Sequence, residues 1–338
     1  MVARSYRVLT EEQIEHFLEK GYVHLEQVFP RELAEEWRAL AFKRLGYDPD
    51  DPSTWVEARV HLPTLHRVRV KDVAPQAWGA ICDLLGGEER IANAEHYSWG
   101  DGFIINFRLG ADREWVPPGP EVRGWHKDGD FFRHFLDSPE QGLLTIVIWS
   151  DIAPRSGGTF VATDSVPIVA RFLAEHPEGV LPGQFPFQEM IRECREFVEL
   201  TGRAGDVVLL HPYILHSASY NPSGRARFIT NPPVALREPM NFNRPDPSEY
   251  SPVELAVLRG LGVKRYAFRP TAPRERIVPE RVRRQQQMLE EQKASPGDRL
   301  GPLSAANVHV ERIEGSPGGH KEPVFLSSAK AEVGTRLR

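Results

Sequence analysis

Between residues 102 and 234, turn-forming residues divide the sequence into short apolar segments. Gly157-Gly158 and Asn221-Pro222-Ser223-Gly224 are two of these turns. The segments have the length and composition of β-strands, and they cover residues 103–109, 143–151, 159–163, 197–200, 207–210, 214–220 and 226–234. Many short strands at close spacing favour a β-sandwich or barrel, a class that includes jelly rolls.

Helices are predicted around this strand-rich region. Thr10-Glu11-Glu12-Gln13 has the form of a capping box, and helical spacing of apolar residues follows it. A strand is predicted over 22–29, and further helices over 31–45, near 77–85 and over 166–175. We therefore expect a mainly β fold with flanking helices in a single domain over residues 1–278.

The composition changes after residue 278. Residues 280–293 are charged and rich in glutamine, which indicates an exposed helix. Residues 295–338 contain scattered glycine, proline and serine with little apolar periodicity, so they cannot bury enough apolar surface to offset their ordering entropy. We expect residues 279–338 to be an exposed helix followed by a mobile C-terminal tail.

Bulk properties exclude several classes of protein. The formal net charge of −5, without a long basic run, argues against binding of nucleic acid or of a membrane surface. Two distant cysteines, Cys82 and Cys194, are too few for a secreted disulfide framework. The first residues lack a signal-peptide apolar region, and the longest apolar run, 142–149, is too short to cross a bilayer. The sequence predicts a cytoplasmic protein.

His126 and Asp128 form the first half of a possible metal site. In an extended chain, residues two apart point to the same side, so an imidazole and a carboxylate at this spacing can converge on one ion. The spacing alone is a weak signal. His126 could instead hydrogen-bond locally, with Asp128 stabilising the turn before Gly129.

The second half comes about ninety residues later with His216, and Arg227 follows eleven residues beyond it. Two imidazoles and one carboxylate make the facial triad of non-haem iron(II) oxygenases, which leaves metal positions open. An arginine adds a planar fork that can bind a carboxylate through two hydrogen bonds. The combination indicates an organic acid bound beside the metal.

Other residues compete for these roles. His211 precedes His216 by five, and an odd spacing on one strand puts the two side chains on opposite faces, so we interpret His211 as structural. Arg225 shares the face of Arg227 by parity and is its rival for the carboxylate. Asp130 and His134 are interpreted as loop residues; His134 could also reach a substrate.

Together with their flanking sequence, these residues resemble the phytanoyl-CoA dioxygenase family of iron(II)/2-oxoglutarate oxygenases. The resemblance covers about residues 10 to 235. The matching segments, in the order that the family shows, are Gly21-Tyr-Val-His-Leu-Glu, Trp125-His-Lys-Asp, Ile148-Trp-Ser-Asp-Ile-Ala-Pro, Ser156-Gly-Gly-Thr-Phe-Val-Ala-Thr, Ala204-Gly-Asp-Val-Val-Leu-Leu-His, and His216 with Arg227.

The resemblance implies a double-stranded β-helix, a distorted, cupin-like jelly roll. It also implies iron(II) held by His126, Asp128 and His216, with 2-oxoglutarate and O2 as cosubstrates and no catalytic residue beyond the ligands. Arg227 matches the arginine that grips the distal carboxylate of 2-oxoglutarate, and Trp149 matches an aromatic position near it. Related halogenases have a small residue in place of Asp128, so hydroxylation or another oxidation is favoured.

One departure concerns Ala218, where the family often carries a hydroxyl residue two positions after the second histidine. Another donor, such as Asn106 or Tyr220, would then complete the cosubstrate pocket. Two alternatives remain: a non-catalytic jelly-roll binding protein with a vestigial or structural metal site, and a cupin-type enzyme without 2-oxoglutarate, which Arg227 disfavours.

The expected substrate is a small molecule, whose identity the sequence does not indicate, and the oligomeric state is not predicted. A hint of an anionic substrate comes from arginines near the expected mouth of the barrel: Arg67, Arg69, Arg108, Arg123 and Arg133.

Overall fold

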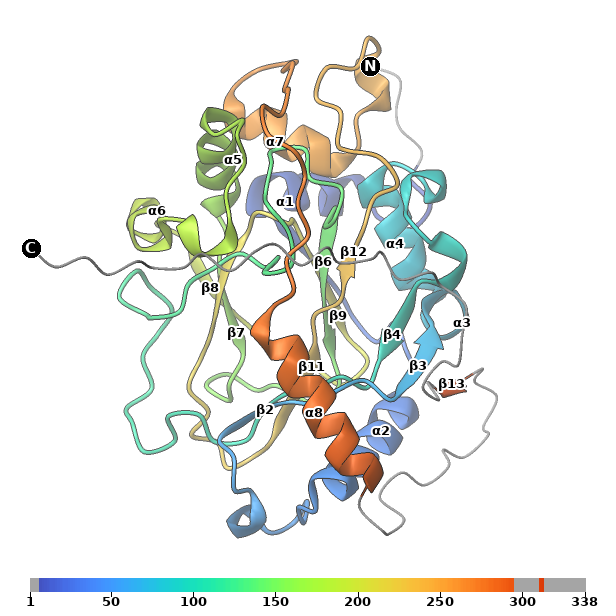
Figure 1. Cartoon of the computed structure of the whole chain (residues 1–338), viewed down its shortest axis with the longest axis vertical. Coiled ribbons are helices and arrows are strands. Elements are labelled where there is room, and N and C mark those ends of the chain that lie inside the picture. The colour runs from blue at the N-terminus through green and yellow to red at the C-terminus, as the bar shows by residue number, and fades with distance from the viewer. Residues whose placement is uncertain (1–5, 295–309, 313–338) are drawn as a thin grey trace, which may run out of the picture.

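The computed structural model of the chain describes residues 6–294 and 310–312. Antiparallel sheets with flanking helices make up these residues (Figure 1). The largest sheet has seven strands in the order β1-β9-β6-β11-β5-β2, with β12 paired to β6. Its strands are β1 (Tyr22–Leu25), β2 (Arg59–His61), β5 (Ile104–Asn106), β6 (Leu143–Ile148), β9 (Val207–Leu210), β11 (Arg227–Thr230) and β12 (Pro233–Val234).

Two smaller sheets accompany the main one. The first has the order β10-β7-β8 and the second the order β13-β3-β4. Their strands are β7 (Thr159–Ala162), β8 (Phe197–Leu200), β10 (Leu215–Ala218), β3 (His66–Arg69), β4 (Ser98–Gly100) and β13 (Val310–Arg312). Within the described residues these sheets do not close into a barrel. The expected antiparallel sheets with flanking helices are present, and each of the seven predicted segments contains a strand.

The helices are α1 (Glu11–Lys20), α2 (Arg31–Leu45), α3 (Val70–Val73), α4 (Pro75–Leu85), α5 (Ser165–Glu175), α6 (Phe187–Glu193), α7 (Pro252–Leu261) and α8 (Glu280–Ala294). Short 3-10 turns are η1 (Pro52–Thr54), η2 (Glu88–Arg90), η3 (Ala94–His96), η4 (Pro182–Gln184) and η5 (Pro247–Glu249). The predicted capping box is present: Thr10 accepts a hydrogen bond from the Gln13 amide, and the Gln13 side chain accepts one from the Thr10 amide. No helix among the described residues is both long and apolar enough to cross a membrane.

Helix α2 covers one face of the main sheet. Trp37 of α2 stacks on Trp149 with ring centroids 4.9 Å apart, and Phe42 packs on Phe228 of β11 at 5.4 Å. Neighbouring residues of a strand point to opposite faces, so Arg227 lies on the other face, where it contacts Gly157 just before β7. The main sheet therefore has an aromatic face against α2 and a second face toward the β10-β7-β8 sheet.

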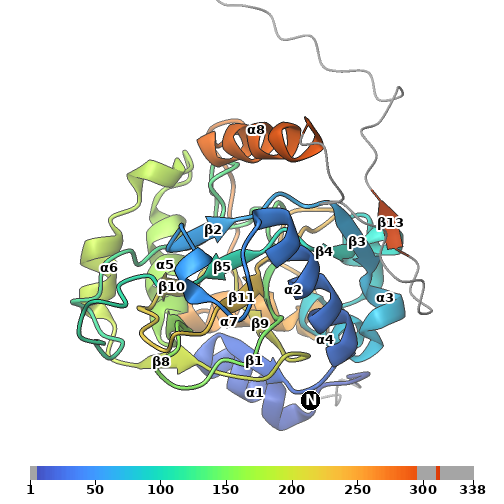
Figure 2. The same ribbon diagram turned by 90° about the horizontal axis from the view of Figure 1, so that it is seen from below.

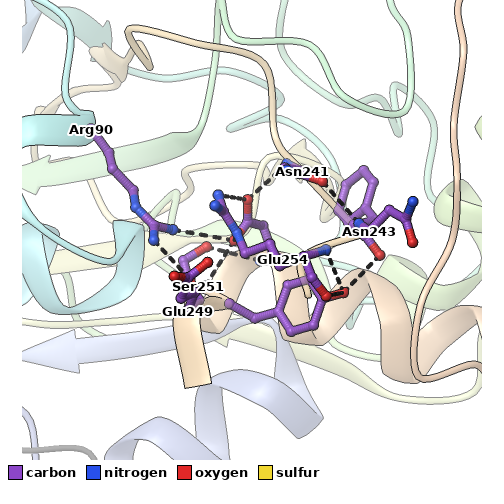
Figure 3. Close-up of polar contacts among 9 residues, drawn as sticks. Arg90, Asn241, Asn243, Glu249, Ser251 and Glu254 are labelled. Atoms are coloured by element: carbon purple, nitrogen blue, oxygen red, sulfur yellow. Dashed lines mark hydrogen bonds and ion pairs between the residues drawn. The ribbon is translucent and has the colours of Figure 1, made fainter. Parts of the chain in front are cut away.

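A buried carboxylate attaches the chain after β12 to helix α7 (Figure 3). Glu254, only 3% exposed, accepts hydrogen bonds from Arg244 at 2.8 Å and from Arg90 at 3.3 Å. It also accepts bonds from the backbone amides of Asn241 and Ser251, both at 2.8 Å. A buried charge requires such partners, so this cluster fixes the loop and the start of α7 together.

The C-terminal helix α8 lies across the end of the main sheet near β2 (Figures 1 and 2). The segment that precedes α8 runs beside the loop that follows Asp128. The Arg133 amide donates to the Glu275 carbonyl, and the Ile277 amide donates to the Phe131 carbonyl. Arg281 of α8 forms a two-bond ion pair with Asp130, at 2.6 and 2.7 Å. The division of the chain at residue 279 stays a prediction, although α8 is attached to the rest of the fold.

The expectation of a mobile tail after residue 294 stays a prediction. Residues 310–312 form β13 and pair with β3, because the edge of β3 offers unpaired backbone groups to an added strand. The other residues of the predicted tail, 295–309 and 313–338, lie outside the described residues.

Candidate metal centre

The structure brings His126, Asp128 and His216 together at the edge of the β10-β7-β8 sheet. His216 belongs to β10, and His126 lies directly opposite it in an isolated antiparallel bridge. The His126 amide donates to the His216 carbonyl at 3.0 Å, and the reverse bond is 2.9 Å. This pairing holds the imidazole rings side by side, with centroids 4.4 Å apart.

The three side chains have the spacing that a single ion needs. Asp128 Oδ1 lies 3.6 Å from His126 Nε2 and 3.4 Å from His216 Nε2. One ligand atom from each residue lies within 4.8 Å of the other two. Two nitrogens and one oxygen at this separation can bind a metal on one face, which leaves its other positions open.

Hydrogen bonds orient both rings. His126 Nδ1 donates to the Gly124 carbonyl at 2.7 Å, and His216 Nδ1 faces the Ile214 carbonyl at 3.3 Å. Because a carbonyl can only accept, these contacts place the imidazole proton on Nδ1 and leave each Nε2 lone pair available to a metal.

Asp128 is the anionic member of the site. Burial alone would raise the pKa of Asp128, but His216 and His126 outweigh it and hold this pKa well below its usual range. Asn231 Nδ2 donates to Asp128 Oδ2 at 2.7 Å, which orients the carboxylate. The sequence reasoning missed Asn231. Asn231 lies an even number of residues after Arg227, and this spacing could have identified it, because it puts both side chains on the same face of the strand.

A cavity of about 660 Å³ opens beside the triad. It is bounded by strand β2, the loop before β4, the residues after β11, and helix α8. The lining residues that carry charge or titrate are Arg59, His61, Arg67, His96, Tyr97, His126, Lys127, Asp128, Asp130 and Arg281. Helix α8, the predicted exposed helix, contributes to the cavity through Arg281 and Gln285.

Arg227 is only 3% exposed. Its Nε donates to the Gly157 carbonyl at 2.8 Å and its Nη1 to the Ile104 carbonyl at 3.3 Å. Among the described residues no carboxylate forms an ion pair with Arg227, and burial together with the nearby Arg59 lowers the pKa of Arg227 to about 9. A buried guanidinium without an anion is costly, so this position suits a carboxylate ligand. The rival Arg225 is exposed.

Trp149 and Asn106, both expected near the cosubstrate, are not brought to the cavity. Trp149 faces α2, packs against Trp37 and Phe29, and donates from Nε1 to Thr230 at 3.0 Å. Its place just after β6 directs it to the helix-covered face of the sheet.

Asn106 faces the same side as Arg227, but its amide is committed elsewhere. It donates to the Ser219 carbonyl at 3.1 Å and accepts from the Leu109 amide at 3.0 Å. The other suggested donor, Tyr220, accepts a hydrogen bond from Arg113.

His211 lies away from the metal centre, as its odd spacing from His216 predicts. It is fully buried, its Nε2 contacts the Val253 carbonyl at 3.2 Å, and its Nδ1 accepts from the Tyr213 amide at 3.1 Å. Burial lowers the pKa of His211 to about 3, so it is neutral at physiological pH. These contacts describe a structural histidine.

Solved structures resemble the chain at low identity. A non-heme alpha-ketoglutarate-dependent carbocyclase, SnoK from nogalamycin biosynthesis, is 17% identical, with a TM-score of 0.42 over 70% of this chain and 87% of that chain. HygX from Streptomyces hygroscopicus, with nickel and 2-oxoglutarate bound, is 16% identical, with a TM-score of 0.36 over 66% and 85%. EctD from S. alaskensis, with 2-oxoglutarate and 5-hydroxyectoine, is 16% identical, with a TM-score of 0.36 over 69% and 78%.

None of the curated proteins matches the chain in sequence. A family model does match it, that of phytanoyl-CoA dioxygenase, over residues 17–229. This match covers more than half of the chain and includes His126, Asp128, His216 and Arg227. The chain therefore belongs to the phytanoyl-CoA dioxygenase family.

Proposed function

We propose that this protein is an iron(II)- and 2-oxoglutarate-dependent dioxygenase that oxidises a small-molecule substrate and releases succinate and CO2. Membership of the phytanoyl-CoA dioxygenase family supports the reaction class. The observation that carries the proposal is the combination of a His-Asp-His triad with a buried arginine that lacks an anionic partner among the described residues. We also propose that the sheets β1-β9-β6-β11-β5-β2 and β10-β7-β8 correspond to the two sides of a double-stranded β-helix.

The residues present fit an iron(II) ion. His126 and His216 each offer Nε2 to the metal, because Nδ1 of each ring already faces a backbone carbonyl. Asp128 offers Oδ1, since its Oδ2 accepts a hydrogen bond from Asn231. The donor set of two imidazoles and one carboxylate is that of non-haem iron(II) oxygenases. When bound, iron(II) supplies the O2 activation that couples decarboxylation of 2-oxoglutarate to oxidation of the substrate.

The chain itself contributes binding and orientation. Arg227 would bind the 5-carboxylate of 2-oxoglutarate, because a planar guanidinium can donate two parallel hydrogen bonds to a carboxylate. Ile229 lies two residues after Arg227 on the same face of β11, and it pairs with Ile104 of β5. These two apolar side chains would exclude water from the contact between Arg227 and the carboxylate. The presence of Asp128 favours hydroxylation or a related oxidation over halogenation.

The test is anaerobic addition of iron(II) and 2-oxoglutarate to the full chain. We expect one iron per chain and a weak visible charge-transfer band, followed by succinate release when O2 is admitted. Asp128→Ala should weaken metal retention and diminish the band, because the site loses its carboxylate ligand. Asp130→Asn is the matched control, since Asp130 lies two residues away, pairs with Arg281 and should leave metal binding intact. Wild-type protein without metal retention or band would refute the proposed function.

A further inference from the structure

Two arginines of the cavity have no ion-pair partner among residues 6–294. Arg59 of β2 and Arg67 of β3 both line it, and neither forms an ion pair or a side-chain hydrogen bond within that range, while Glu311 of β13 lies opposite Arg67 in the strand register. The acidic residues that line the cavity are Asp128, in the metal centre, and Asp130, which is already paired with Arg281. No described carboxylate of the cavity therefore remains to neutralise them.

Three other arginines that were expected near the mouth of the cavity are occupied. Arg69 pairs with Asp72, Arg133 with Glu275, and Arg108 donates to the carbonyls of Trp55 and Val56. None of these three lines the cavity. Among the arginines that the sequence placed near the mouth, Arg67 alone faces the cavity, so the structure selects one residue from that group.

The proposed metal and cosubstrate do not supply the missing negative charge. An iron(II) ion and Arg227 together carry three positive charges, and Asp128 with dianionic 2-oxoglutarate carries three negative ones, so that part of the site is balanced. Lys127 is turned toward His134 Nδ1, 2.6 Å away, and toward the Asp128 carbonyl. Among the residues that line the loaded cavity, Arg59 and Arg67 thus leave an excess of positive charge.

Gln141 is an independent sign of a polar ligand. It is 2% exposed and lines the same cavity, yet neither Nε2 nor Oε1 of its amide has a hydrogen-bond partner among the described residues. Buried amides are nearly always hydrogen-bonded, because an unpaired one has lost its hydrogen bonds to water without replacement. The unused donor and acceptor of Gln141 are therefore available to a bound molecule.

We propose that the substrate is a small polar organic acid, with a carboxylate or phosphate group bound by Arg67 and a hydroxyl, amine or carbonyl group bound by Gln141. Arg59 provides a second positive charge nearer to Arg227, since both residues pair in register with Asn106 and so lie on one face of the main sheet. This inference rests on the proposed function, because the charge balance assumes bound metal and 2-oxoglutarate.

The experiment uses the full chain loaded with nickel(II) and 2-oxoglutarate, and loading is verified first by the cosubstrate's own binding isotherm. Failure to load would contradict the proposed function and not this inference. Ligand-observed NMR titrations then compare lactate with lactamide and glycerol 3-phosphate with glycerol. The two pairs distinguish a carboxylate from a phosphate, and each neutral member controls for size and hydroxyl groups.

We expect at least one acid to bind about tenfold or more tightly than its neutral partner, as for one charge-assisted hydrogen-bonded contact. Arg67→Gln should remove this preference, and Gln141→Leu should weaken the acid and its neutral partner alike. Arg69→Gln, which alters the same strand outside the cavity, should retain the preference. Equal binding of acids and neutral partners would overturn the proposal, and so would a preference that survives Arg67→Gln. Loss of 2-oxoglutarate binding in Arg67→Gln would also overturn the proposal, because Arg67 would then bind the cosubstrate and not the substrate.

Discussion

Replacement of Arg227 tests the cosubstrate site most directly. With 2-oxoglutarate bound, Arg227→Ala removes a buried, charged hydrogen-bonded pair, which is worth roughly 3 kcal/mol, or about a hundredfold in affinity. Arg227→Lys should recover only part of this loss, because an ammonium group cannot reproduce the planar fork. Arg225→Ala is the matched control, since Arg225 is exposed on the same segment and should have a much smaller effect.

The stability of the cosubstrate-free protein should respond differently. Burial and Arg59 lower the pKa of Arg227 to about 9, and a fall of this size from the ordinary arginine value corresponds to roughly 5 kcal/mol of cost for the charged form. Against this cost stand two hydrogen bonds from the guanidinium to the Gly157 and Ile104 carbonyls, each worth roughly 1.5–3 kcal/mol. These contributions oppose each other, so removal of Arg227 should change the unfolding free energy by less than the roughly 3 kcal/mol expected for cosubstrate affinity.

Two assays separate these effects. A 2-oxoglutarate titration of succinate formation gives the apparent cosubstrate affinity, and urea unfolding without cosubstrate gives the stability. Iron binding without 2-oxoglutarate should change little in Arg227→Ala, because no metal ligand is altered. If Arg225→Ala impaired cosubstrate use and Arg227→Ala did not, the assignment of the inward-facing arginine would be refuted.

Three further predictions concern the rest of the fold. Glu254→Ala should lower the free energy of unfolding in urea by about 3–5 kcal/mol, because it leaves two arginines around a buried site without their carboxylate, whereas the exposed Glu249→Ala should have little effect. Trp149→Phe should cost about 1–3 kcal/mol of stability through lost packing on Trp37, with the 2-oxoglutarate affinity unchanged; a large loss of cosubstrate affinity would contradict the position of Trp149 described above. Truncation after residue 293 should preserve folding and metal binding, because nearly all of α8 is retained, and a large fall in melting temperature would show that the removed residues stabilise the fold.

Local periodicity in the sequence predicted one half of the candidate metal centre. His126 and Asp128 are two residues apart in an extended segment, so they were expected on one face, and the structure brings both to His216. The same alternation separated His211 from His216. The helix that follows Thr10 was equally predictable, because a capping box is a hydrogen-bond pattern within four consecutive residues.

Only the tertiary structure decided which residues share the cavity. Alternation along a strand gives two faces but does not say which of them a helix will cover. The structure places Trp149 against α2, on the face of the main sheet opposite Arg227. Asn231, Gln141 and Arg281 reach the site from segments far apart in the sequence. Their positions follow from the packing of sheets and helices, because contacts between distant segments depend on the whole core and leave no periodic signal in the chain.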